Sequence, residues 1–264
     1  MAGMRISAGP ADYHIRKEYT MLLTYANGLY GYGGYGGLYF DPTMILALIG
    51  LLLSSLAAAG VKNTFAQYNR VRSLSGMTGA QAAQRVLQTA GISDVRIEHV
   101  AGSLSDHYDP RDKVLRLSDS TFGSASVAAV CVAAHECGHA IQDQEKYGPL
   151  VLRSTLVPAA NLGSQMAWPI FVAGIIFSMR PLLTAGILLF CLAVLFQLVT
   201  LPVEFNASSR ALAILNDSAI LTEQEMTGAK KVLKAAAMTY VAALASSLLQ
   251  LLRLILLSRR NDRD

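Results

Sequence analysis

Four stretches of the chain are almost free of charged side chains, namely residues 44–61, 165–179, 182–203 and 235–258. A helix needs about 20 residues to cross the apolar core of a bilayer, so the first and third stretches predict transmembrane helices. The second is expected to pair with the third as a hairpin, through a two-residue turn at Arg180 and Pro181. The fourth contains Arg253 and is either another span or a helix lying on the membrane surface.

Residues 62–147 form the one sizeable polar region, in which helical and strand-like patterns follow each other. Thr78 with Gln81 three positions later is typical of a capping box, opening a helix that Gly91 ends. Residues 94–100 and 113–118 alternate polar and apolar side chains and are predicted strands, separated by a turn at DPRD. A longer helix is expected from about Ser124, with an apolar part too short to span a bilayer.

These patterns together predict an α+β membrane protein, mostly helical, with three or four transmembrane helices and a small extramembrane domain. The expected organisation is a flexible Gly/Tyr-rich lead-in (1–40), a first transmembrane helix (41–61), the extramembrane domain (62–160), a transmembrane hairpin (161–203), an amphipathic helical segment (204–232) and a C-terminal transmembrane or interfacial helix (233–258).

Composition agrees with a membrane protein, because 53% of the residues are hydrophobic and only 15% are charged, against about a quarter charged in soluble domains. The net charge of +4 does not indicate nucleic-acid binding, since no basic cluster interleaved with aromatic residues occurs. Basic residues at the edges of the membrane explain the positive net charge more simply, and the expected binding partner is the lipid bilayer. The three cysteines, Cys131, Cys137 and Cys191, form no disulfide framework.

The candidate chemistry lies in HECGH, residues 135–139 of the predicted long helix. His135 and His139 are four positions apart, so a helix places both imidazoles on one face, where they can bind the same zinc ion. Glu136 lies beside that face and can act as the general base on a water activated by the metal. Gly138 removes a side chain where backbone must approach closely. The motif predicts a zinc-dependent hydrolase with a zincin-like domain.

A catalytic zinc site requires a third protein ligand. Glu145 and Asp143 follow the motif, but Gln142 replaces the glycine that would bend the chain back, and Asp143 continues an unbroken helix. Glu204 follows the most hydrophobic stretch directly, where a lone carboxylate is otherwise costly. A hairpin of the second and third spans would return Glu204 to the face beside the HECGH helix. Glu204 is therefore the favoured ligand, with Glu145 and Asp143 as alternatives.

Three blocks of sequence resemble the bacterial membrane-bound neutral zinc metallopeptidases, the YugP-like family. They are HECGHAIQDQ, GSLSDHYDPRDKVLRLSDS and LFQLVTLPVEFNASSRAL, and the similarity runs from about Tyr39 to the last apolar helix. The resemblance implies an integral-membrane zinc endopeptidase acting on an unidentified protein or peptide. More remotely, EFNAS is similar to the E-x-x-A-D segment of HtpX-type membrane proteases, whose glutamate is the third zinc ligand. Ser208 stands where that pattern has aspartate.

Secondary roles are assigned to four further residues. His107, Tyr108 or Arg210 could stabilise the oxyanion, and Asn206 could support a ligand. The segment 113–118 is similar to the edge strand of zinc peptidases, which pairs with extended substrate.

The side of the membrane follows from the positive-inside rule, because basic residues flank the first and fourth spans on the side of the polar domain. They are Lys62, Arg70, Arg72, Lys230, Lys231 and Lys234. We therefore expect a multi-pass membrane protein with a cytoplasmic active site, although Arg16, Lys17, Arg259, Arg260 and Arg263 oppose this bias if the last helix spans.

The competing functions are intramembrane proteolysis of the site-2 type, disfavoured because no D-G pair occurs, and a non-catalytic zinc-containing scaffold or assembly factor. The sequence does not predict an oligomeric state.

Overall fold

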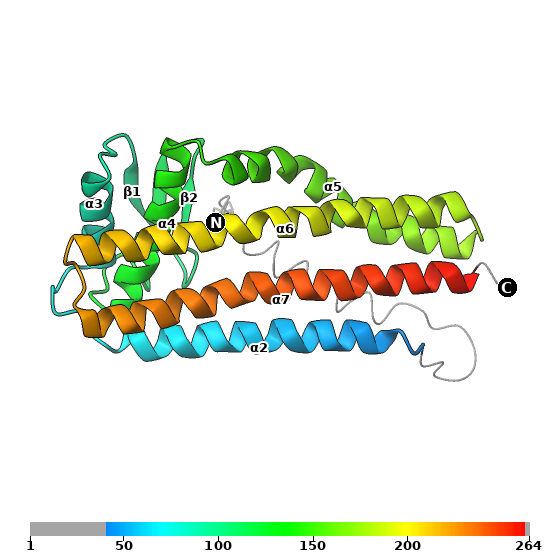
Figure 1. Cartoon of the computed structure of the whole chain (residues 1–264), viewed down its shortest axis with the longest axis horizontal. Coiled ribbons are helices and arrows are strands. Elements are labelled where there is room, and N and C mark those ends of the chain that lie inside the picture. The colour runs from blue at the N-terminus through cyan, green and yellow to red at the C-terminus, as the bar shows by residue number, and fades with distance from the viewer. Residues whose placement is uncertain (1–40, 262–264) are drawn as a thin grey trace, which may run out of the picture.

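The computed structural model describes residues 41–261 and is mostly helical, with a small sheet at one end (Figure 1). The predicted lead-in, residues 1–40, lies outside the described residues. The elements in chain order are α2 (Met44–Asn69), α3 (Gly79–Thr89), β1 (Arg96–Val100), β2 (His107–Asp109), β3 (Val114–Ser118), α4 (Val127–Gln144), α5 (Gly148–Ile176), α6 (Arg180–Asp217) and α7 (Glu223–Asn261). The expectation of a mostly helical membrane protein with a small sheet is confirmed by the number and type of these elements.

Four of these helices, α2, α5, α6 and α7, are long and apolar enough to cross a membrane. They pack in the order α5, α6, α7, α2, with α5 and α6 as a hairpin and α7 running alongside α2 (Figure 1). Ser246 of α7 bonds across to α2, its hydroxyl lying 2.8 Å from the Gly50 carbonyl oxygen and 2.9 Å from the Ser54 hydroxyl. Small residues of this kind allow transmembrane helices to approach closely.

The last apolar stretch is part of one continuous helix and packs on the other spans. Arg253 of α7 lies over the Trp168 ring of α5, with 6.0 Å between the guanidinium carbon and the ring centroid. The hairpin turn differs from the expected one, because α5 ends at Ile176 and α6 already begins at Arg180. Pro181 therefore stands in the first turn of α6, where its missing N–H costs no helical hydrogen bond.

The four internal boundaries expected from hydropathy, at residues 61, 160, 203 and 232, each fall inside a helix. Hydropathy changes where the chain leaves the bilayer, but the polar residues that follow are good helix formers, so the helix continues. As a result α2, α6 and α7 extend beyond their apolar parts and contribute directly to the extramembrane unit at one end of the bundle (Figure 1).

The sheet has the strand order β1-β3-β2, with β1 parallel and β2 antiparallel to β3. Both predicted strands, within 94–100 and 113–118, are present. The expectation that 113–118 forms an edge strand is wrong, because β3 lies between the other two. The sequence pattern missed β2, whose three residues are too few for a periodic signal, and with it one of the two edge strands, the other being β1.

The extramembrane core brings together α3, α4, the sheet and the ends of α2, α6 and α7. The capping box predicted for α3 is present, with the Thr78 hydroxyl accepting from the Gln81 N–H and the Gln81 amide accepting from the Thr78 N–H. The long helix begins at Val127 rather than Ser124, because Ser126 caps it by accepting from the Ala129 N–H. Leu115 and Leu117 of β3 are fully buried against this core, which fixes the position of α4.

Candidate metal centre

Three side chains from two helices converge where α4 packs against α6. His135 and His139 lie on α4 and Glu204 lies on α6, and their potential ligand atoms are all within 4.8 Å of one another. The Glu204 Oε2 atom lies 3.3 Å from His135 Nε2 and 3.5 Å from His139 Nε2. The two imidazoles therefore present their Nε2 atoms to a shared point with one carboxylate oxygen.

This convergence depends on an unusually close contact between the α4 and α6 backbones. A Cβ atom on Gly138 would lie 2.5 Å from the carbonyl oxygen of Ala207, well inside van der Waals distance. The expected close backbone approach at Gly138 is thus confirmed, and its partner is the helix that carries Glu204. Ala207 is itself fully buried in this contact.

The cluster is suited to a divalent cation. The Glu204 side chain is only 3% exposed, and its Oε2 is buried with no hydrogen-bond partner within the described part of the chain. A buried carboxylate oxygen without a partner is costly unless a cation or donor compensates it. Two imidazole nitrogens and one carboxylate oxygen form a common catalytic zinc donor set. The other oxygen, Oε1, is 3.3 Å from Arg153 Nη1 on α5.

Each histidine has a partner on its other ring nitrogen. His139 Nδ1 lies 3.0 Å from Gln142 Oε1, and His135 Nδ1 lies 3.2 Å from the Ser208 hydroxyl. Ser208 stands where the remote resemblance has aspartate, so the contact with His135 is made by a hydroxyl group. Such partners orient metal-binding imidazoles.

Glu136 lies next to the cluster on α4. Burial raises the pKa of Glu136 to about 7, and the carboxylates of Asp106 and Glu204 act in the same direction, while His135 opposes them. The backbone of Tyr108 in β2 hydrogen-bonds to Glu136 and also lowers the pKa. A carboxyl group that titrates near neutral pH can both accept and return a proton, as a general base requires.

The two alternative third ligands have other partners. Asp143 accepts hydrogen bonds from the Tyr108 hydroxyl and from Lys113 Nζ, each at 2.8 Å. Glu145 forms an ion pair with Arg210 at 2.6 Å and is more than half exposed. Among residues 41–261, neither carboxylate joins the cluster of His135, His139 and Glu204.

Tyr108 and Arg210, two of the proposed oxyanion residues, make their described contacts outside the cluster. The Tyr108 hydroxyl is bound to Asp143, and Arg210 is held by Glu145 and by Asn206, whose Oδ1 accepts from the Arg210 Nε at 2.7 Å.

His107, the third proposed oxyanion residue, neighbours Tyr108 on β2. Tyr108 pairs with Leu115 on the face of the sheet that packs into the core. His107 therefore projects from the opposite face, where its Nδ1 is 3.0 Å from the Ser105 carbonyl oxygen.

Asn206, predicted as a supporting residue, contacts Gln142 and Arg210 and none of the three clustered side chains directly. Its Oδ1 accepts from Gln142 Nε2 at 2.9 Å. The sequence argument missed two neighbours, Gln142 and Arg153. Gln142 follows His139 by three residues, which is a signal for a contact on one helical face. The only indication in the sequence that Arg153 has a role is that it is a single charge in an otherwise apolar helical stretch.

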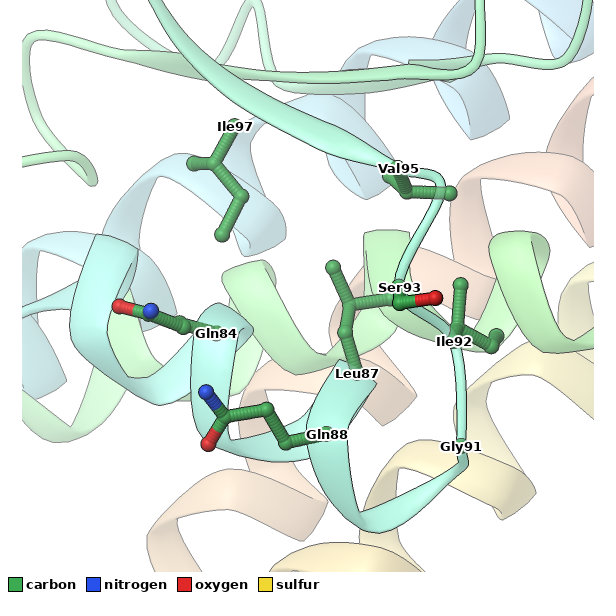
Figure 2. Close-up of a pocket in the computed structure, with 8 residues that line it drawn as sticks. All are labelled: Gln84, Leu87, Gln88, Gly91, Ile92, Ser93, Val95 and Ile97. Carbon is green, nitrogen blue, oxygen red and sulfur yellow. The ribbon is translucent and has the colours of Figure 1, made fainter.

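A groove of about 630 Å³ lies elsewhere on the extramembrane unit, between α3 and β1. Figure 2 shows Leu87 of α3 and Ile97 of β1 pointing into it, with Gln84 and Gln88 at its side. None of its lining residues belongs to the cluster of His135, His139 and Glu204, so the groove and the candidate metal centre are separate features.

Comparison with known proteins gives concordant results. Residues 43–259 match the family model described as "Putative neutral zinc metallopeptidase". The chain is 46% identical over 221 residues to the "Putative membrane protease YugP" of Bacillus subtilis (strain 168), covering 84% of this chain and 98% of the relative. No solved structure matches the chain significantly. The resemblance predicted from the three sequence blocks is confirmed.

Proposed function

Because the chain belongs to the neutral zinc metallopeptidase family, we propose that it is an integral-membrane zinc endopeptidase. His135, His139 and Glu204 hold the metal, in a zincin-like unit of the gluzincin type. The observation that carries this proposal is the convergence of these three side chains from α4 and α6 around a buried carboxylate oxygen that otherwise has no partner in the described structure.

Glu136 is the general base. When bound at this site, zinc polarises the scissile carbonyl and makes water a stronger acid. Glu136 accepts a proton from the attacking water and returns it to the amine that leaves as the C–N bond breaks. Burial raises the pKa of Glu136, which favours uptake of a proton by its carboxylate.

The substrate lies along β2 as an extended peptide. β2 is at the edge of the sheet and contacts α4, and the Tyr108 backbone reaches the Glu136 carboxylate. An edge strand offers unpaired N–H and C=O groups, so main-chain pairing would bind peptides with little dependence on sequence. β2 thus replaces 113–118 as the candidate strand for substrate.

Cleavage takes place at the membrane surface, on the cytoplasmic side. Glu204 directly follows the apolar part of α6, so the proposed zinc ligand stands where that helix leaves the bilayer. The basic residues flanking α2 and α7 at this end support the cytoplasmic orientation. Reporter fusions to the loop between α3 and β1 would test it: a green fluorescent protein there should fluoresce, and a periplasmic phosphatase there should be inactive.

The function is tested by zinc content and peptide-library digestion of three purified proteins, namely the wild type, Glu204→Ala and Glu136→Gln. The wild type should contain one zinc ion and cleave peptides. Glu204→Ala should lose most of its zinc, whereas Glu136→Gln should keep zinc and lose proteolysis. Full zinc content in Glu204→Ala would refute the ligand assignment. Wild-type zinc without any cleavage, together with an unchanged cellular role of Glu136→Gln, would favour the scaffold.

A further inference from the structure

We propose that Gln142 is a positioning residue that fixes the proton of His139 on Nδ1 and so leaves Nε2 free to bind metal. The inference rests on the proposed zinc site, which it deepens by naming the residue that prepares one ligand. It concerns the hydrogen-bond pattern of one buried amide, shared between α4 and α6.

The orientation of the Gln142 amide is set by its partners. Gln142 is completely buried. Its Nε2 donates to the Val203 carbonyl oxygen at 2.8 Å and to Asn206 Oδ1 at 2.9 Å. A backbone carbonyl can only accept, so the atom facing Val203 must be the amide nitrogen. The amide oxygen consequently faces His139 Nδ1, at 3.0 Å.

The position of the imidazole proton follows from this orientation. Gln142 Oε1 can only accept a hydrogen bond, so His139 Nδ1 must carry the proton that it donates. A neutral imidazole has one N–H, which leaves the lone pair on Nε2, the atom 3.5 Å from Glu204 Oε2. Without an acceptor at Nδ1, the proton could move to Nε2 and block the metal-binding atom.

The neighbours of Gln142 hold this arrangement in place. Asn206 Oδ1 also accepts from Arg210 Nε at 2.7 Å, so the side of Asn206 that faces Gln142 is an acceptor. Arg210 is anchored in turn by Glu145. Because Val203 and Asn206 flank Glu204 on α6, the same amide connects His139 to the helix that supplies the third ligand.

His135 provides an internal comparison. Its Nδ1 faces the Ser208 hydroxyl at 3.2 Å. A hydroxyl can rotate to donate or to accept, so Ser208 does not determine which nitrogen of His135 is protonated. Of the two histidines, therefore, only His139 has its tautomer fixed by its hydrogen-bond partner.

The test uses the full-length zinc-free protein with ¹⁵N-labelled histidine. Solid-state ¹⁵N spectra, recorded at a pH where His139 is neutral and assigned with a His139 variant, report which nitrogen carries the proton. The wild type should show the Nδ1–H form. Gln142→Met should give a substantial Nε2–H population and an about 10–100-fold weaker zinc affinity in chelator competition. Ser208→Ala should leave the His139 signal unchanged.

Gln142→Glu separates positioning from packing. Its carboxylate still accepts from Nδ1–H but cannot donate to Val203 or Asn206, so it should keep the His139 tautomer and most of the zinc affinity while lowering the Tm. A wild-type Nε2–H signal, or a Gln142→Met protein with unchanged tautomer and zinc affinity, would overturn the proposal. Failure of the proposed function is distinguishable, because it appears as a wild type that binds no zinc or cleaves no peptide, whatever the tautomer.

Discussion

Gly138 of α4 lies so close to Ala207 of α6 that a single added methyl group would stand 2.5 Å from the Ala207 carbonyl oxygen. The contact lies between the helix that carries both histidines and the helix that carries Glu204. The spacing of these two backbones therefore sets the distance between the three proposed metal ligands.

Gly138→Ala is expected to disrupt the site. The new methyl group must push α6 away, which costs about 1–3 kcal/mol of stability as overpacking does and moves Glu204 away from the imidazoles. Zinc stoichiometry and Tm in detergent measure the two effects. Gly60→Ala is the matched control, because it lies within α2 with nothing within 4 Å of the added Cβ. It should retain full zinc and an equal or higher Tm. Full zinc in Gly138→Ala would show that this backbone contact does not control the zinc site.

Arg153→Met should destabilise the zinc-free protein more than the zinc-loaded one. Arg153 provides the cationic partner of the buried Glu204 carboxylate at 3.3 Å, and bound zinc would supply a second positive charge. Breaking a buried pair costs several kcal/mol, and because the Arg153 side chain is 29% exposed we expect a smaller loss, about 1–3 kcal/mol. Thermal unfolding with chelator and with zinc should show a larger gap between the two Tm values than in the wild type. An unchanged gap would show that Arg153 does not compensate Glu204.

Glu136→Gln should remove a pH dependence of stability from the zinc-free protein. Burial raises the pKa of Glu136 from 4.5 to about 7, so the folded state holds this proton more strongly than the unfolded state. The stabilisation of the folded state by the protonated Glu136 is fully present below pH 4.5, and it is lost as the pH rises to about 7. At pH 8 the variant should therefore be more stable than the wild type, by up to about 3 kcal/mol.

Unfolding at pH 5 and pH 8 with chelator measures this difference. Glu223→Gln, at an exposed carboxyl group, is the control and should follow the wild type. A difference in stability between the wild type and Glu136→Gln that is the same at both pH values would contradict a raised pKa at Glu136.

Tyr108→Phe distinguishes a structural from a catalytic hydroxyl. The Tyr108 hydroxyl donates to Asp143 at 2.8 Å, and Asp143 also accepts from Lys113. We expect a loss of about 0.5–1.5 kcal/mol in stability from the missing hydrogen bond, with kcat/KM within severalfold of the wild type. Loss of an oxyanion donor would instead lower kcat by about 10²–10³. A decrease of that size at unchanged Tm would reassign Tyr108 to the oxyanion.

Several parts of the site could be predicted because they depend on short-range sequence order. The i, i+4 spacing of His135 and His139 fixes their common face on any helix, and Thr78 with Gln81 forms a capping box within one turn. Glu204 could also be proposed, because an isolated carboxylate at the end of an apolar stretch needs a partner. By contrast, β2 has three residues and no periodicity, so its place at one edge of the sheet could not be predicted from the sequence.

The sequence by itself determined the apolar helices, the HECGH motif and the family, since each depends on residues that are close together along the chain. Only the tertiary structure decided which carboxylate joins the histidines, that Arg153 contacts Glu204 and Gln142 contacts His139, and that β3 is central. These relationships join residues far apart in sequence, such as Gln142 with Val203 and Arg153 with Glu204. They depend on how closely and at what register helices pack, which is set by side-chain volume across the interface and not by any local pattern.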